Sequence, residues 1–167
     1  NKVREGREDE IRECIGCNIC ISSWHDGVPV RCTQNATAGE EWRKGWHPEK
    51  FDSPGSNDRI LIVGGGPAGL EAALVAAKRG YRVAIADKAS EMGGRLLFET
   101  RLPGLNSWSR VQDYRLYALQ QMGNVDIYTD SELGVEEVFA LEYQRVAIAT
   151  GARWTRALYS SLEIPVG

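Results

Sequence analysis

Residues 60–69 read ILIVGGGPAG, and this stretch decides the fold. Four aliphatic residues that run into glycines predict a short strand buried on both faces of a parallel sheet. A helix is expected next, because apolar side chains recur at the spacing of one helix face and Gly80 stands where such a helix would end. These apolar residues are Leu70, Ala73, Leu74 and Ala77. The stretch therefore predicts the first strand, turn and helix of a βαβ unit.

Strand-like and helix-like segments continue to alternate beyond this unit. Apolar runs at residues 83–86, 125–128 and 146–149 predict three further strands. One helix is expected over about 108–122 and a shorter one over about 135–141. One side of the longer helix would carry Val111, Tyr114, Ala118 and Met122. The order predicts an α/β fold, a Rossmann-like doubly wound parallel sheet of the FAD/NAD(P)-binding type, incomplete in this chain.

The glycine turn fits the pattern G-x-G-x-x-G between a strand and a helix, which is the context that gives this pattern its mechanism. Gly64, Gly66 and Gly69 would form the tight turn, let the backbone approach a pyrophosphate, and let helix and strand pack closely. The helix amide groups would then face the phosphates. The alternative is a βαβ turn whose glycines serve its geometry only.

Asp87 ends the second predicted strand, twenty-one residues after Gly66. A carboxylate at this place would accept hydrogen bonds from a ribose 2′-hydroxyl and repel a 2′-phosphate, so the site should favour ADP, FAD or NAD over NADP. The neighbouring Lys88 works against that preference.

Two further stretches belong to the predicted nucleotide site. Arg95 follows two glycines and is a candidate phosphate contact, although an ordinary turn explains these residues equally well. Thr150 and Gly151 follow the last strand, at the edge where such folds bind ligands. The whole set of predicted nucleotide-binding residues is Gly64, Gly66, Pro67, Ala68, Gly69, Asp87, Lys88, Arg95, Thr150 and Gly151.

All four cysteines lie within the first 32 residues, with the spacing C-x2-C-x2-C-x11-C. Three closely spaced thiolates can take three corners of a cubane cluster while a fourth arrives from farther along the chain, so the pattern predicts a [4Fe-4S] site. Gly16 and Asn18 suit the surrounding loop because both tolerate unusual backbone conformations. Structural zinc, whose sites usually pair two separated knuckles, and disulfides are the alternatives. The predicted metal ligands are Cys14, Cys17, Cys20 and Cys32.

The chain before residue 58 is poor in aliphatic residues, and no Leu precedes Leu61. Such a segment holds a shape only if a metal cluster, disulfides or a larger body organises it. Turn formers at 51–58 predict a linker, so we expect a cluster-binding segment with its linker at 1–57 and a dinucleotide-binding half-domain, truncated at its C-terminus, at 58–167. Packing in the first unit is expected from Trp24, Trp42 and Trp46. No role is assigned to His25 and His47.

Composition excludes several classes of partner. Twenty basic and twenty-three acidic residues leave a net charge of −3, and no stripe of like charge indicates a nucleic acid or an anionic membrane. No apolar stretch approaches the roughly 20 residues that a membrane helix requires, and the first ten residues lack the features of a signal peptide. We expect a cytoplasmic protein. Because the chain begins at Asn1 and ends soon after a strand-like segment, we also expect a fragment.

The motifs together resemble one class of iron–sulfur flavoproteins, which includes trimethylamine, dimethylamine and histamine dehydrogenase and 2,4-dienoyl-CoA reductase. The resemblance covers nearly the whole chain, and the cysteine spacing favours the amine dehydrogenase branch, because the reductases space their second and third cysteines one residue wider. It is carried by CIGCNIC at 14–20, CTQNATAGEE at 32–41, GWHPEKF at 45–51, the GGGPAG turn, LPGL at 102–105 and ATGARW at 149–154.

The resemblance implies a longer enzyme whose TIM barrel, missing here, carries FMN, the small amine substrate and the catalytic residues. The cluster would pass electrons singly from FMN to an electron-transferring flavoprotein, and the full-length enzyme is expected to be a homodimer. The dinucleotide fold would hold ADP, or FAD in the alternative of an NAD(P)H-dependent dienoyl-CoA or enoate reductase. A non-enzymatic electron carrier or nucleotide-binding module is the alternative from another class.

Overall fold

The structure is a computed structural model that describes residues 2–44, 51–52 and 56–152. The predictions for Trp46 and His47 lie outside these residues. Four parallel strands form one sheet in the order β3-β2-β1-β4. The strands are β1 (Arg59–Val63), β2 (Arg82–Ala86), β3 (Val125–Tyr128) and β4 (Arg145–Ile148). The predicted doubly wound parallel sheet is therefore confirmed, since β2 and β3 extend the sheet to one side of β1 and β4 to the other.

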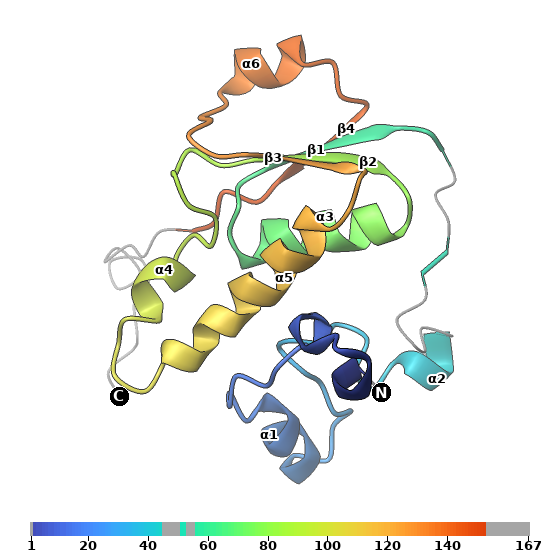
Figure 1. Cartoon of the computed structure of the whole chain (residues 1–167), viewed down its shortest axis with the longest axis vertical. Helices are drawn as coiled ribbons and strands as arrows, with labels where there is room; N and C mark the ends of the chain where they lie inside the picture. The colour runs from blue at the N-terminus through green and yellow to red at the C-terminus, as the bar shows by residue number, and fades with distance from the viewer. Residues whose placement is uncertain (1, 45–50, 53–55, 153–167) are drawn as a thin grey trace, which may run out of the picture.

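Helices cover both faces of this sheet. Figure 1 shows the sheet nearly edge-on, with α3 (Pro67–Lys78) and α5 (Arg110–Gln120) on one side and α6 (Val135–Ala140) on the other. Two short elements, α4 (Leu96–Glu99) and the 3₁₀ turn η3 (Asn106–Ser109), connect β2 to α5. None of the helices in the described ranges is long and apolar enough to cross a membrane.

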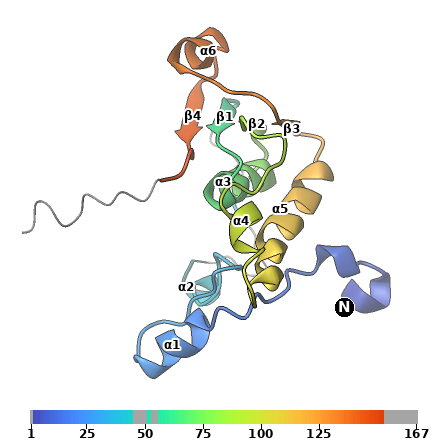
Figure 2. The ribbon, with the colours of Figure 1, turned by 90° about the vertical axis from the view of Figure 1, so that its left-hand side faces the viewer.

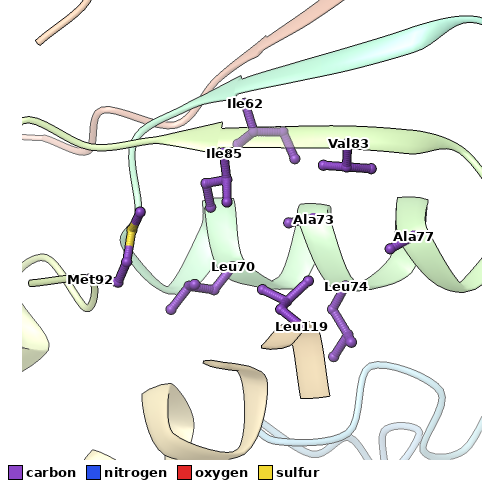
Figure 3. Close-up of a cluster of buried hydrophobic side chains, with 9 residues drawn as sticks. All are labelled: Ile62, Leu70, Ala73, Leu74, Ala77, Val83, Ile85, Met92 and Leu119. Carbon is purple, nitrogen blue, oxygen red and sulfur yellow. The ribbon is translucent and has the colours of Figure 1, made fainter. Parts of the chain in front are cut away.

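The main hydrophobic core fills the space between the sheet and the helices α3 and α5. Ile62 of β1 and Ile85 of β2 are paired in the sheet and both point toward α3 (Figure 3). Leu119 of α5 closes the cluster from the opposite side and is fully buried. The buried members of this core are Ile62, Leu70, Ala73, Leu74, Ala77, Val83, Ile85, Met92 and Leu119. The four predicted helix-face residues of α3 all belong to it.

The other face of the sheet has a smaller core under α6. Leu61, Val63 and Ala84 are buried there against partly buried side chains from α6 and its flanking loops. Successive residues of a strand point to opposite faces, so a strand with helices on both sides must be apolar at every position. This explains the unbroken run Ile60–Val63.

The helix predicted at 108–122 has a different start, and of the apolar side predicted for it Val111 is buried. The turn η3 precedes it, and the α-helix itself begins at Arg110. The predicted residues Tyr114, Ala118 and Met122 are only partly buried against the core. Its buried side chains are Val111, Gln112, Arg115 and Leu119. The prediction included Val111 and missed the other three residues, two of which are polar.

The first 44 residues lie against α5, on the side away from the sheet (Figures 1 and 2). They form η1 (Lys2–Glu5), η2 (Glu8–Glu10), α1 (Ile19–His25) and α2 (Glu41–Lys44). Among the described residues before Arg59, Ile15 is the one buried hydrophobic side chain, and it packs against Leu96 and Val111. The expectation that tryptophans pack in this segment is wrong for Trp24 and Trp42, which are 67% and 83% exposed.

Polar contacts join this segment to the sheet domain. Arg115 of α5, only 4% exposed, donates to Glu71 Oε2 at 2.7 Å, to Gln34 Oε1 at 2.8 Å and to the Val111 carbonyl at 2.8 Å. Gln34, 3% exposed, donates in turn to the carbonyls of Glu13 and Arg110 at 3.1 and 3.2 Å. The buried guanidinium is therefore paired and hydrogen-bonded, as a buried charge must be.

Leu119 offers a direct test of the packing between α5 and the sheet. The substitution Leu119→Ala empties a fully buried position, so it should lower the free energy of unfolding by about 2–5 kcal/mol. The control Gln120→Ala changes the next, exposed residue of the same helix and should stay within about 0.5 kcal/mol. Urea unfolding of the two variants at matched cofactor content measures both values, and an equal loss in the two would contradict this packing.

Candidate functional site

A cavity of about 330 Å³ lies at the carboxyl ends of β1, β2 and β4. The strand order reverses between β1 and β4, and open α/β sheets bind their ligands in the crevice at such a point. The cavity is lined by Val63, Gly64, Ala86, Asp87, Lys88, Ser131, Glu132, Leu133, Thr150, Gly151 and Ala152. The predicted residues Gly64, Asp87, Lys88, Thr150 and Gly151 are therefore brought together.

Volume alone does not select this cavity. A larger hollow of about 600 Å³ lies between the N-terminal turns and α5, and Lys2, Glu10 and Tyr117 are among the residues that line it. None of the described residues that line that hollow stands at the carboxyl end of a strand. The position at the carboxyl edge, and not size, identifies the candidate ligand site.

Gly64 and Gly69 are required by the fold itself. Gly64 has φ of +111°, and a Cβ there would collide with the carbonyl of Ala149 on the neighbouring strand end. A Cβ on Gly69 would collide with the carbonyl oxygen of Gly64. Helix α3 consequently lies directly against the end of β1, as predicted for the first and last glycines of the pattern.

Gly66 has a different reason to be glycine. Its φ is −74°, and a Cβ there would meet nothing within 4 Å. Gly66 caps the N-terminus of α3, and the exposed Pro67 and Ala68 form its first turn. The fold would accept a side chain at Gly66. Glycine therefore keeps the space in front of the helix open, and the free amide groups there favour an anion.

The Asp87 carboxylate is held in position by backbone groups. Its Oδ2 accepts a hydrogen bond of 2.5 Å from the Gly65 amide, and its Oδ1 accepts one of 2.8 Å from the Ala89 amide. Each oxygen retains a free lone pair for a ligand hydroxyl. Lys88 beside it is exposed and lies 3.9 Å from Glu132, a surface pair that moderates the lysine charge at the cavity.

The loop at 93–95 reaches the glycine turn but not with its arginine. The Gly93 amide donates to the Gly65 carbonyl at 2.8 Å, and a Cβ on Gly94 would come within 3.1 Å of Gly66 Cα. Arg95 instead lies along α4 and pairs with Glu99 at 2.7 Å. Arg95 is not among the described residues that line the cavity, so the structure does not bring this predicted contact into it.

Sequence reasoning missed one wall of the cavity, formed by Ser131, Glu132 and Leu133. These residues follow β3, and the Ser131 amide donates to the Asp87 carbonyl at 2.8 Å, which anchors the loop beside β2. The available signal was their place just after a predicted strand, since the carboxyl ends of parallel strands meet at one edge.

The four cysteines lie on the N-terminal segment as free thiols. Cys14 and Cys17 are in one loop, Cys20 is in α1, and Cys32 is in the return loop. Gly16 and Asn18 both have left-handed backbone conformations, with φ of +69° and +58°. This agrees with the prediction that both residues adopt unusual backbone conformations in this loop. One left-handed residue therefore lies between Cys14 and Cys17, and another between Cys17 and Cys20.

One contact joins the two cysteine-bearing loops. Cys17 Sγ lies 3.1 Å from Thr33 Oγ1, the side chain next to Cys32. This hydroxyl, followed by the Ile19 amide, lowers the pKa of the Cys17 thiol below its ordinary value, because both can donate to a thiolate.

In the part of the chain that the structure describes, no three Cys, His, Asp or Glu side chains are grouped closely enough to hold a metal ion. The thiols are thus close in sequence but do not form a metal-coordinating group in the described residues, and the set of four cysteine ligands stays a prediction. Their chemistry fits an iron–sulfur cluster, because four free cysteines on one short segment are the donors such clusters use.

Comparison with known proteins adds the family. The family model described as Pyridine nucleotide-disulphide oxidoreductase matches residues 58–164, which is more than half of the chain. The chain belongs to the pyridine nucleotide-disulphide oxidoreductase family. The matched range contains the whole candidate cavity and the glycine turn of this family member.

Several relatives of this family member are amine-oxidising enzymes. Dimethylamine dehydrogenase of Hyphomicrobium sp. (strain x) is 46% identical over 160 residues, which cover 92% of this chain and 22% of that protein. The structure of 6-hydroxypseudooxynicotine amine oxidase from Pseudomonas geniculata N1 is 54% identical with a TM-score of 0.88, over 93% of this chain and 23% of that one. Histamine dehydrogenase from Rhizobium sp. 4-9 is 51% identical with a TM-score of 0.88, over 93% and 22%.

These matches confirm the predicted resemblance to the amine dehydrogenase branch. They also set its extent, because the chain spans less than a quarter of the length of each of these relatives.

An experiment can distinguish Gly69, which the fold requires, from Gly66, which leaves space for a ligand. Gly66→Ala should leave the free energy of unfolding within about 0.5 kcal/mol of the parent, yet weaken ADP or FAD binding about tenfold or more, because the new methyl group fills the space before the helix. Gly69→Ala should instead destabilise the fold by about 1–3 kcal/mol, since helix and strand must separate. Calorimetric titration and urea unfolding of both variants test this, and unchanged nucleotide affinity in Gly66→Ala would contradict it.

Proposed function

We propose that this chain is the electron-transfer and nucleotide-binding part of an iron–sulfur flavoprotein that oxidises a small amine. The observation that carries the proposal is the joining of a four-thiol segment to a dinucleotide fold through the buried contacts of Arg115 and Gln34. This combined unit is 46% to 54% identical in sequence to three amine-oxidising enzymes over more than nine-tenths of the chain, which supports the substrate class.

The nucleotide would bind across the carboxyl edge of the sheet. Its pyrophosphate would face the free amides that follow Gly66, and a ribose hydroxyl would donate to Asp87, whose two oxygens are already oriented by the amides of Gly65 and Ala89. The loop at Ser131 would close the adenine end. We favour ADP here, with FAD as the alternative, because a 2′-phosphate would lie against the Asp87 carboxylate.

The metal group would be a [4Fe-4S] cluster held by Cys14, Cys17, Cys20 and Cys32, and when bound it supplies one-electron transfer. The protein residues provide thiolates and the left-handed turns at Gly16 and Asn18 that orient them. Ile15, buried between these cysteines and the sheet domain, fixes the loop against Leu96 and Val111. FMN and the amine would be bound by a barrel domain outside this chain, and an electron-transferring flavoprotein would be the acceptor.

Cofactor analysis tests the proposal directly. The anaerobically purified holoprotein should release ADP and contain about four irons and a matching amount of sulfide per chain. The variant Cys32→Ser should lose iron and sulfide but keep the nucleotide, because Cys32 is not among the described residues that line the cavity. Zinc without sulfide would overturn the cluster, and FAD in place of ADP would favour the reductase alternative.

Electron flow separates the amine dehydrogenase from the reductase. A small amine, with dimethylamine and histamine as the first trials, should bleach the flavin of the anaerobic longer enzyme that includes the proposed barrel domain, and NADH should not. In Cys32→Ser the flavin should still bleach, because the amine is oxidised at the flavin and not at the cluster. Reduction of an electron-transferring flavoprotein should slow by about a hundredfold or more, which corresponds to a rise of roughly 2.7 kcal/mol in the activation free energy of electron transfer to the acceptor. Stopped-flow absorbance measures both steps. Bleaching by NADH with no response to amines would refute the proposal.

A further inference from the structure

Thr33 contacts a predicted cluster ligand without being one. Its hydroxyl oxygen lies 3.1 Å from Cys17 Sγ, within hydrogen-bond distance for sulfur. In the free thiol either atom can donate, because S–H and O–H are both donors. A cysteine that binds iron is a thiolate and can only accept, so the proton of this bond must then come from Thr33.

The position of Thr33 is set by its neighbour in the chain. Gln34 is 3% exposed, and its side chain is held at both ends, since Nε2 donates to two carbonyls and Oε1 accepts from Arg115 at 2.8 Å. Arg115 Nη2 also donates to the Gln34 carbonyl at 3.3 Å. The backbone on the C-terminal side of Thr33 is therefore anchored in the sheet domain.

Thr33 itself is exposed, and the contact of its hydroxyl in the described part of the chain is with Cys17 Sγ. An exposed threonine on a rigid loop needs no such bond to keep its backbone in place. The contact is therefore better explained by what it does to the sulfur than by what it does to the fold.

We infer that Thr33 is a positioning residue that donates a hydrogen bond to the Cys17 thiolate and thereby raises the reduction potential of the cluster. The physical reason is that a donor stabilises negative charge on sulfur, and the reduced cluster carries one more negative charge than the oxidised one. The inference rests on the proposed cluster. The Thr33 hydroxyl would thus make reduction of the cluster by one electron more favourable.

The test compares Thr33→Val with Thr33→Ser in the holoprotein. Valine has nearly the shape of threonine and lacks the hydroxyl, whereas serine retains it. Redox titration with dithionite and mediators, followed by electron paramagnetic resonance, should give Thr33→Val a lower midpoint potential, by an amount on the order of 59 mV, equal to about tenfold in a one-electron equilibrium constant. Thr33→Ser should keep the parent potential. The control Thr129→Val makes the same change at an exposed position after β3 and should also keep it.

Iron and sulfide are counted in every sample, so that failure of this inference differs from failure of the proposed function. A parent protein without a cluster refutes the proposed function. A loaded Thr33→Val variant with the parent potential refutes the role of Thr33. Loss of iron from Thr33→Val, but not from Thr33→Ser, would also overturn it, because the hydroxyl would then be holding the site together and not tuning it. An unchanged iron content, together with a shift of the iron–sulfur stretching bands in Thr33→Val alone, supports the role of Thr33.

Discussion

The close approach of helix α3 to strand β1 is the constraint on which the rest of the structure depends. The Gly64 carbonyl lies where a side chain of Gly69 would stand, and Gly64 itself has no room for a Cβ beside Ala149. This contact brings Leu70, Ala73 and Ala77 onto the sheet and aims the helix N-terminus at the carboxyl edge. The hydrophobic core and the candidate cavity are therefore two results of the same packing.

The N-terminal segment is attached by polar contacts more than by apolar burial. Arg115 reaches Glu71 on α3 and Gln34 in the return loop at once, so one buried guanidinium joins the nucleotide helix to the loop that carries Cys32. Removal of one partner from such a network leaves a buried charge without compensation, which makes the network sensitive to substitution. The cysteine-bearing loop and helix α3, which begins beside the candidate cavity, consequently share a common support.

The parallel sheet and five of the eleven residues that line the cavity were predictable, because strands, glycine turns and strand ends are visible as short patterns in the chain. Buried strands are visible as apolar runs, and the glycine pattern between Val63 and Leu70 is typical of a turn that joins a strand to a closely packed helix. Asp87 followed from its place at the end of β2. The buried face of α5 was not predictable in the same way, because Arg115 and Gln112 are polar and become interior only through partners from the first 44 residues and the loop at Gly93.

The sequence by itself determined the fold class, the glycine turn, the Asp87 position and the cysteine spacing, since short-range sterics and strand periodicity govern them. The tertiary structure alone decided which distant groups meet. It placed Ser131 beside Asp87 and left Trp24 exposed. It also set the Thr33 hydroxyl against Cys17. Such contacts depend on the relative placement of segments far apart in the chain, and no local pattern encodes them.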